Sequence, residues 1–244
     1  MRAAGHRPWP RPRTPWLMRM RWHELCFLHW RIEPDVLRPL LPPGLGLDTF
    51  DGTAWLGVVP FRMTDVAPRH VPRFAPLTDF AELNVRTYVT AGGKPGVWFF
   101  SLDATQPLAV RLARSCFHLA YLDAAITIRR DADAIDYRSV RTHLGGGVAE
   151  LAVRYRPTGP PAVSAPGTLE HFLTERYCLY AATRRGRLRR QDVDHPPWPL
   201  QPAEATLETC TMARPIGVEL APQPDLVHYA ERLDVVAWLP HRVP

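Results

Sequence analysis

Residues 82–89 alternate strictly between polar and apolar side chains, and this pattern constrains the fold more than any other in the chain. A period of two is typical of a β-strand, in which successive side chains point to opposite faces of a sheet. One face carries Leu83, Val85, Thr87 and Val89, and the other carries Glu82, Asn84, Arg86 and Tyr88. The polar face meets either solvent, as ordinary surface, or the inside of a closed sheet, where it lines a cavity.

Further strand-like runs follow one another along the chain, separated by turns rich in proline and glycine. They lie at 22–31, 97–102, 125–130, 135–141, 148–156, 206–212 and 227–239. Asp51 and Gly52 predict a hairpin turn, and Pro60 predicts an edge or a bend in the strand that follows it. Helical patterns occur at 34–41, 105–117 and 168–181. Many short strands and few helices predict an α+β fold dominated by an antiparallel, closed sheet.

Positive charge is concentrated at the start of the chain. Six arginines precede the first acid, Glu24, and without them the 24 remaining basic residues equal the 24 acidic ones. Arginine and proline alternate over residues 1–20, which predicts a disordered extension, and residues 21–244 are expected to form a single domain. Met18 and Met20 are alternative start positions to Met1.

Several functional classes are disfavoured by missing patterns. The chain shows no secretory signal and no apolar run long enough to span a bilayer, so a cytoplasmic location is expected. Cys26, Cys116, Cys178 and Cys210 are widely spaced, which favours reduced, mostly buried thiols over a disulfide framework or a zinc site. The histidines have no metal-binding spacing, although ligands can assemble from distant segments. Serine-nucleophile, phosphate-loop and dinucleotide motifs are absent. No metal and no cofactor are predicted.

Seven short motifs in a fixed order resemble those of one protein family. They are HW at 29–30, LLPPGL at 40–45, DGTAWLGVVPF at 51–61, ELNVRTYV at 82–89, GVWFFSLDA at 96–104, LTERYCLY at 173–180 and HPPWPL at 195–200. Each is weak alone, but their order makes residues 22–238 similar to the YqjF-like family of uncharacterised bacterial proteins, within the acetoacetate decarboxylase-like superfamily. The resemblance implies a cone-like antiparallel β-barrel with a central cavity and a few flanking helices.

The same resemblance places a tyrosine where the decarboxylases carry their reactive lysine. In those enzymes an arginine precedes adjacent lysines, in a pattern like R-E-x-x-G-x-P-K-K. Aligning Arg114 with that arginine puts Tyr121 on the Schiff-base lysine and Ala120 where many relatives have proline. The one lysine of the chain, Lys94, is expected in an exposed glycine turn. A phenol cannot form an imine, so the sequence predicts no Schiff-base chemistry and no acetoacetate decarboxylase activity.

The resemblance also favours an inward orientation of the polar strand face. Glu82 is then the first candidate for an acid or base and Tyr121 for a hydroxyl donor, while Arg86 would hold an anion. The remaining expected binding residues are Asn84, Tyr88, Ser101, Asp103, Arg114 and Arg176. Two of these have structural alternatives: Asp103 could pair with Arg114, and Arg176 could fix the helix that precedes it.

Three function classes remain open from the sequence. The first is a protein that binds, and transforms, a small anionic or carbonyl-bearing molecule by acid–base chemistry, such as a lyase acting on small organic acids. The second is a non-catalytic small-molecule-binding module on the same fold. The third, ranked lower, binds nucleic acid or an anionic surface through the arginine-rich start and residues 184–190. No membrane or nucleic-acid partner is predicted, and a homo-oligomer is compatible with the sequence.

Overall fold

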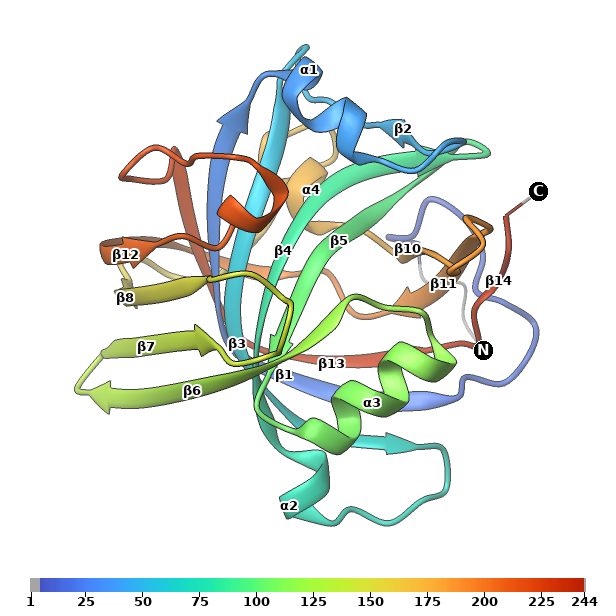
Figure 1. Cartoon of the computed structure of the whole chain (residues 1–244), viewed down its shortest axis with the longest axis horizontal. Coiled ribbons are helices and arrows are strands. Elements are labelled where there is room, and N and C mark those ends of the chain that lie inside the picture. The colour runs from blue at the N-terminus through green and yellow to red at the C-terminus, as the bar shows by residue number, and fades with distance from the viewer. Residues whose placement is uncertain (1–4, 244) are drawn as a thin grey trace.

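The computed structural model describes residues 5–243, including all their side chains except those at positions 76, 112 and 116 (Figure 1). Fourteen strands make up most of this part of the chain. They are β1 (Met18–Ile32), β2 (Gly46–Leu47), β3 (Ala54–Pro68), β4 (Phe80–Ala91), β5 (Lys94–Ala104), β6 (Tyr121–Asp131), β7 (Ala134–Arg141), β8 (Glu150–Pro157), β9 (Ala162–Val163), β10 (Cys178–Ala182), β11 (Leu188–Asp194), β12 (Pro199–Cys210), β13 (Leu226–Ala237) and β14 (His241–Arg242).

Helices are few and short, as the sequence predicts. They are α1 (Pro34–Leu37), α2 (Ala75–Thr78), α3 (Pro107–Cys116) and α4 (Leu169–Thr174), with 3-10 turns η1 (Arg38–Leu40) and η2 (Arg214–Ile216). The helix expected at 168–181 ends at Thr174, and Cys178–Ala182 belong to β10 instead.

Most neighbouring strands are antiparallel, but β5 runs parallel to both β6 and β10. Parallel neighbours cannot be joined by a tight turn, and α3 forms the crossover between β5 and β6. This helix begins with Pro107, whose fixed backbone angle suits a first turn. The β5–α3–β6 unit brings the start of β6 beside the end of β5, where Leu102 pairs with Tyr121.

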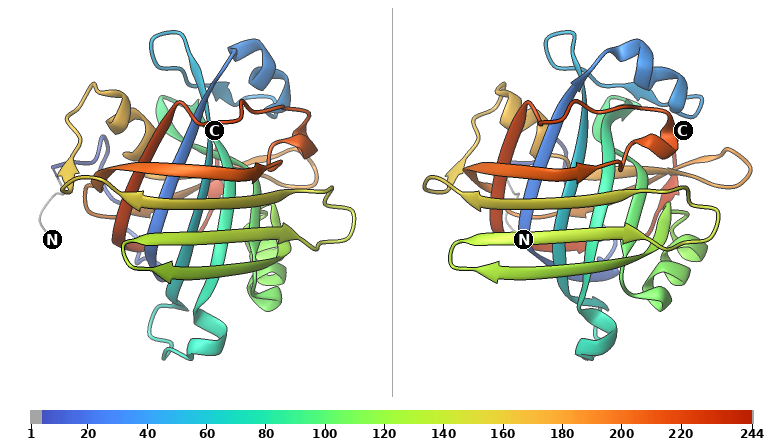
Figure 2. Two further views of the ribbon diagram at one scale, coloured as in Figure 1. Left: turned by 90° about the vertical axis from the view of Figure 1, so that its left-hand side faces the viewer. Right: turned by 60° about the vertical axis from the view of Figure 1, so that its left-hand side comes forward.

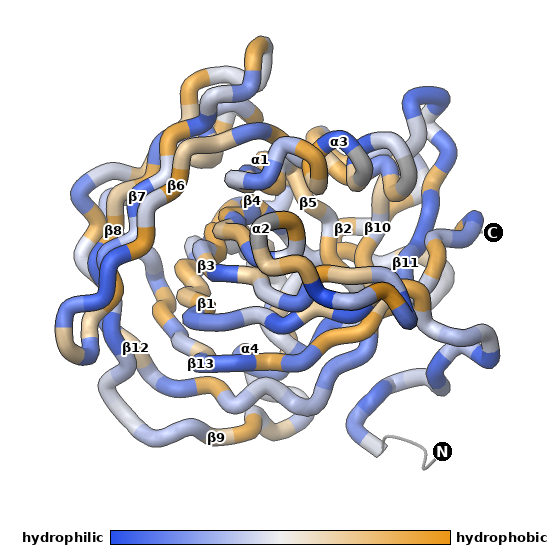
Figure 3. Tube along the Cα trace, turned by 90° about the horizontal axis from the view of Figure 1, so that it is seen from below, coloured by the Kyte–Doolittle hydropathy of each residue, from blue (hydrophilic) through white to orange (hydrophobic). Residues whose placement is uncertain are grey.

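All the strands except β9 form one continuous path in the order β14-β11-β10-β5-β6-β7-β8-β12-β13-β1-β3-β4-β2, and β9 pairs with β12 outside this path. Additional pairings of β4 with β5 and of β11 with β13 close this path on itself. Figure 2 shows β6, β7, β8 and β12 crossing β1, β3 and β4 as a second layer. Seen from below in Figure 3, the central strands lie between β6–β8 on one side and β10–β11 on the other.

Both faces of β4 are consequently buried. Leu83 and Val85 pack in a core with Tyr137 and Tyr155 of the second layer. The opposite, polar face is also covered, and Glu82, Asn84 and Tyr88 are at most 4% exposed. The interpretation of this face as ordinary surface is therefore wrong.

The Asp51–Gly52 turn forms as predicted, but it does not join two paired strands. Phe50 and Thr53 close the turn through an isolated bridge, whereas β2 pairs with β4. Pro60 lies in the middle of β3 rather than at an edge. It is tolerated there because it faces the stretch, between His23 and Leu28, where the pairing of β1 with β3 shifts register.

Residues 5–17, which we call the N-terminal strap, form no helix or strand but pack against the sheet. We expected residues 1–20 to be a disordered extension. In the described part of this segment, however, the Arg7 side chain is only 1% exposed, and Trp9 donates a hydrogen bond to Asp192. β1 already begins at Met18. Arginine and proline prevent regular structure here, but they do not prevent ion pairing with buried carboxylates. Residues 1–4 lie outside the described residues.

Two further expectations concern cysteines and membranes. Cys26 and Cys178 are buried free thiols and Cys210 is a partly buried one, while the Cys116 side chain lies outside the described set. Within residues 5–243, no helix combines the length and apolar character needed to cross a membrane.

A buried ion pair connects the central strands to the second layer. Arg141 of β7 donates from Nε and Nη2 to the two carboxylate oxygens of Asp103 at 2.6 and 2.8 Å. It also donates to Ser101 and to the Gly146 carbonyl. The two charged side chains are 2% and 0% exposed, so each depends on the other for compensation of its charge.

We predict that Arg141→Met lowers the free energy of unfolding by about 3–5 kcal/mol, because it leaves Asp103 buried without a counter-charge. Urea denaturation of purified protein measures this change. Arg138→Met is the matched control on the same strand: Arg138 pairs with Glu208 at a site where both side chains are 57% exposed. Its cost should stay below about 1 kcal/mol. Equal losses in the two variants would contradict the structural role assigned to Arg141.

Candidate functional site

Glu82 and Tyr121 form a buried hydrogen-bonded pair on the polar face of β4. The Tyr121 hydroxyl donates to Glu82 Oε2 at 2.6 Å. Antiparallel pairing of β4 with β5 and parallel pairing of β5 with β6 bring the two residues together. Arg114 Nη1 donates to the Tyr121 carbonyl at 2.7 Å, and Tyr137 donates to the Glu82 carbonyl at 2.8 Å. The backbones on both sides of the pair are therefore fixed.

Burial alters the acidity of both groups. The pKa of Glu82 is raised from its ordinary value of 4.5 to about 8, mainly by desolvation, with a smaller contribution from the negative charge of Asp103. The hydrogen bond from Tyr121 partly opposes this rise. The pKa of Tyr121 is raised well above 10 by burial and by its carboxylate neighbour. At neutral pH the pair is therefore mostly uncharged and holds a proton that can be transferred.

Arg86 lies on the same face and has no counter-ion among residues 5–243. Its guanidinium lies over the rings of Phe27 at 5.3 Å and Tyr88 at 5.8 Å. One long hydrogen bond, 3.4 Å, reaches the Leu173 carbonyl. Among the described residues no carboxylate forms an ion pair with Arg86, and its buried Nε has no hydrogen-bond partner. A guanidinium in this setting can bind a carboxylate from elsewhere.

Other polar atoms around Arg86 are also unpartnered within residues 5–243. They are the buried Asn84 Oδ1 and His29 Nδ1. The indole nitrogen of Trp198, whose ring contacts Phe27 rather than Arg86, is also without a partner in this range. His29 Nε2 lies 2.6 Å from the Tyr88 hydroxyl. Burial, and after it the nearby Arg86 charge, lowers the pKa of His29 well below 6.5, so this histidine is neutral.

Sequence reasoning missed three residues that complete this face. Phe27 stacks with His29 at 6.2 Å, and Trp198 contacts the Phe27 ring edge-on at 5.0 Å. The sequence contains evidence for two of them, because Phe27 and His29 are two residues apart in a strand-like run and therefore share a face. Trp198 follows a proline-rich segment without any period, and its position depends on the tertiary fold.

The expected binding residues divide into two groups. Glu82, Asn84, Arg86 and Tyr88 share one face of β4, where Tyr121 contacts Glu82 at one end and Arg86 contacts the Tyr88 ring further along the strand. The remaining four, Ser101, Asp103, Arg114 and Arg176, have structural partners of their own, although Arg114 also holds the Tyr121 backbone and Arg176 lies over the Tyr88 ring at 5.1 Å.

Ser101 and Asp103 are held by Arg141, which the sequence analysis did not identify. The predicted Asp103–Arg114 pair is therefore wrong, because α3 directs Arg114 to the start of β6. Arg176 has the structural role that the sequence analysis gave as an alternative. It donates hydrogen bonds to the Phe172 carbonyl and to Asp48, both at 2.6 Å, and so fixes α4.

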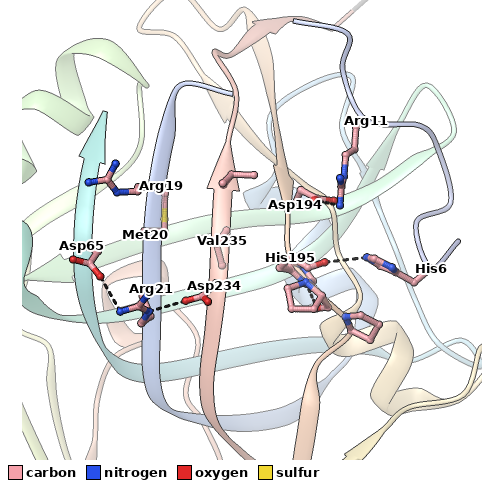
Figure 4. A pocket seen from close by; sticks show the side chains of 13 residues that line it. His6, Arg11, Arg19, Met20, Arg21, Asp65, Asp194, His195, Asp234 and Val235 are labelled. Carbon is pink, nitrogen blue, oxygen red and sulfur yellow. Dashed lines mark hydrogen bonds and ion pairs between the residues drawn. The ribbon is translucent and has the colours of Figure 1, made fainter. Parts of the chain in front are cut away.

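A cavity of about 440 Å³ lies elsewhere, between the N-terminal strap and the ends of β1 and β13 (Figure 4). Its lining includes His6, Arg11, Arg21 and His195, and neither Glu82 nor Tyr121 contributes to it. Within the described residues, no group of three or more His, Cys, Asp or Glu side chains could hold a metal ion.

Comparison with known proteins places this site in a family context. A model of the family DUF2071, described as an uncharacterized conserved protein, matches residues 19–234. The chain belongs to this family. It is 42% identical over 223 residues to the uncharacterized protein YqjF of Bacillus subtilis (strain 168), a match that covers 91% of each chain.

Solved structures of more distant proteins share the fold of this DUF2071 member. Acetoacetate decarboxylase from Legionella pneumophila has a TM-score of 0.64 at 13% identity, with 100% of this chain and 96% of that chain covered. The enduracididine biosynthesis enzyme MppR, complexed with the condensation product of pyruvate and imidazole 4-carboxaldehyde, has a TM-score of 0.63 at 14% identity, with 94% and 90% covered. At these identities the likeness concerns the fold alone.

The raised pKa of Glu82 predicts a pH-dependent stability with a definite sign. Between about pH 4.5 and about pH 8 the folded protein keeps a proton that the unfolded chain releases, so the free energy of unfolding falls as pH rises. Glu82→Gln removes this contribution, which is on the order of a few kcal/mol over that range. Urea denaturation at about pH 5 and about pH 8 should show Glu82→Gln gaining stability relative to the parent protein at the higher pH.

The exposed Glu208→Gln serves as the control and should follow the parent protein at both pH values. A stability difference between Glu82→Gln and the parent that does not change with pH would show that Glu82 has an ordinary pKa.

Proposed function

We propose that this protein binds a small carboxylate that also carries a carbonyl group, with Arg86 holding the carboxylate, and that Glu82 and Tyr121 transfer a proton to or from it. The observation that carries the proposal is a partly buried arginine with a buried, unpartnered Nε and no ion pair among residues 5–243. It lies on the same strand face as a carboxyl group that shares a hydrogen bond with a phenol. The site would lie inside the closed sheet, in the cone-like barrel expected from the sequence.

The charge distribution favours an anionic ligand. A buried guanidinium is normally paired, and three arginines with buried side chains, Arg7, Arg141 and Arg176, each have an aspartate. Arg86 is only partly buried, but its Nε is buried. Arg86 instead has two aromatic rings and one carbonyl. The unpartnered indole and imidazole nitrogens nearby would suit ligand oxygens, since buried polar groups are nearly always hydrogen-bonded.

The Glu82–Tyr121 pair supports acid–base chemistry rather than imine formation. In the ionised state, Glu82 can accept a proton from a carbon next to the ligand carbonyl. Tyr121 can donate its hydrogen bond to the carbonyl oxygen as that oxygen gains negative charge. The C–H bond breaks, the proton moves to the Glu82 carboxylate, and the electron pair is shared with the carbonyl oxygen.

Lys94 does not substitute for a catalytic amine in this proposal. It begins β5, whereas Glu82 pairs with Ala104 at the other end of that strand. Ten residues of extended chain separate the two positions, which corresponds to roughly 30 Å. The Lys94 ammonium lies 5.3 Å from the centre of the Trp9 ring. Tyr121 at the position of the decarboxylase lysine is thus part of the proposal, and so is the absence of a Schiff base.

Binding is tested with three matched probes: 2-oxobutyrate, butyrate, which lacks the carbonyl, and 2-butanone, which lacks the charge. Calorimetry should detect binding of the two carboxylates and not of the ketone. Arg86→Met should weaken that binding by about 10- to 100-fold, the range for loss of a charge-assisted hydrogen bond. Arg138→Met is the control and should bind like the parent protein. If neither carboxylate binds, or if both bind Arg86→Met unchanged, the proposed anion site is wrong.

Catalysis is tested by following deuterium exchange into carbon 3 of 2-oxobutyrate by NMR in heavy water. The enzyme-dependent rate should rise as pH increases through about 8, because the base is the ionised form of Glu82. Glu82→Gln should abolish it, and Tyr121→Phe should lower it by roughly 100-fold. Saturable binding without any exchange would instead establish the non-catalytic binding module. A borohydride-trapped adduct on Lys94 would contradict the exclusion of imine chemistry.

A further inference from the structure

The N-terminal strap packs against β11 and compensates buried negative charge there. Asp194, which is 7% exposed, has two arginine partners, Arg7 at 2.8 Å and Arg11 at 2.6 Å, and both belong to the strap. Arg7 also donates to the Val193 carbonyl at 2.6 Å. Figure 4 shows His6 directed toward His195 and Arg11 toward Asp194 at one border of the cavity.

Arg7 differs from Arg11 in what lies behind it. The Arg7 side chain is 1% exposed, and its guanidinium lies 4.9 Å from the centre of the Tyr177 ring, a cation–π arrangement. Arg11 is 33% exposed. The Tyr177 ring also stacks on His195, with 4.5 Å between ring centres and 18° between their planes.

Tyr177 is connected to Trp198 through a single carboxylate. The Tyr177 hydroxyl donates a short hydrogen bond to Glu175 Oε2, and Glu175 Oε1 accepts from the Trp198 backbone nitrogen at 2.8 Å. The Trp198 ring in turn packs against Phe27 and stacks on Trp22. Phe27 carries the Arg86 guanidinium on its face.

In this series of contacts, the position of the Trp198 ring depends on how its backbone is held. Its indole nitrogen has no hydrogen-bond partner among residues 5–243, so only packing and the Glu175 contact hold the ring against Phe27. On the side of the strap, the Tyr177 ring contacts Arg7 and also His6, at 5.5 Å between ring centres, so Arg7→Met would remove the closer and charged one of the two contacts.

We propose that Arg7 is a positioning residue for the Arg86 site: through Tyr177 and Glu175 it fixes Trp198 against Phe27, the ring on which Arg86 rests. This inference rests on the proposed function, because the site that it positions is the proposed carboxylate site. It assigns the N-terminal strap a role in ligand binding beyond the compensation of Asp194.

The positioning role is tested first without any ligand. Protein labelled with 5-fluorotryptophan gives one ¹⁹F resonance for each tryptophan, and Trp198→Phe identifies the signal of Trp198. Arg7→Met should shift or broaden that signal, whereas Arg11→Met, which removes the other strap arginine from the same aspartate, should leave it in place. Tyr177→Phe interrupts the connection with the strap intact and should also move the signal, which keeps the test decisive if Arg7→Met does not fold.

The second measurement is the affinity for 2-oxobutyrate. Arg7→Met and Tyr177→Phe should weaken binding by roughly threefold to tenfold, the effect of disordering one side chain at a binding surface, and Arg11→Met should not. An unchanged Trp198 signal in folded Arg7→Met and Tyr177→Phe would overturn the proposal. A moved signal with unchanged affinity would overturn the link between the strap and the site. If the parent protein does not bind 2-oxobutyrate, the proposed function fails, and the Trp198 signal still decides whether Arg7 positions that ring.

Discussion

The burial of β4 on both faces is the constraint on which the rest of this structure depends. A strand in the interior of two layers can bury apolar side chains at little cost, but each polar side chain on it loses its water. Glu82, Asn84 and Arg86 therefore need partners from the protein or from a ligand. Glu82 has one in Tyr121. Among residues 5–243, the one hydrogen bond of the Arg86 guanidinium is a long one to a carbonyl, and its other neighbours are two aromatic rings. The proposed chemistry follows from this difference.

Arginine pairing separates structural from functional positions in this chain. Arg141 and Asp103 satisfy each other on one side of β5, and Arg176 with Asp48 fixes α4. The strap arginines do the same for Asp194. Against this background the lack of a carboxylate beside Arg86, among the described residues, is informative. The same polar residue type supports the fold where it is paired and offers a binding group where it is not.

The fold likeness to acetoacetate decarboxylase and the chemistry of the site lead in different directions. In this chain, the pairing of β4 with β5 and of β5 with β6 explains why a strand after α3 presents its first residue, Tyr121, to a carboxylate on β4. The side chain at that position is a phenol, and the one lysine of the chain lies at the far end of β5. Under the proposed function, this framework would carry out proton transfer without covalent attachment of the ligand.

The sequence by itself determined the alternation of β4, the turn at Asp51 and Gly52 and the crossover helix α3, because each depends on local backbone preferences. It also grouped Glu82, Asn84, Arg86 and Tyr88 on one face, since side-chain direction in a strand has a period of two. Only the tertiary structure decided that this face is buried and that Asp103 pairs with Arg141 and not Arg114. The packing of the strap against Asp194 was likewise decided only by the tertiary structure. These contacts join residues far apart in the chain, and the partner of a buried charge is set by which strands become neighbours, which no local pattern specifies.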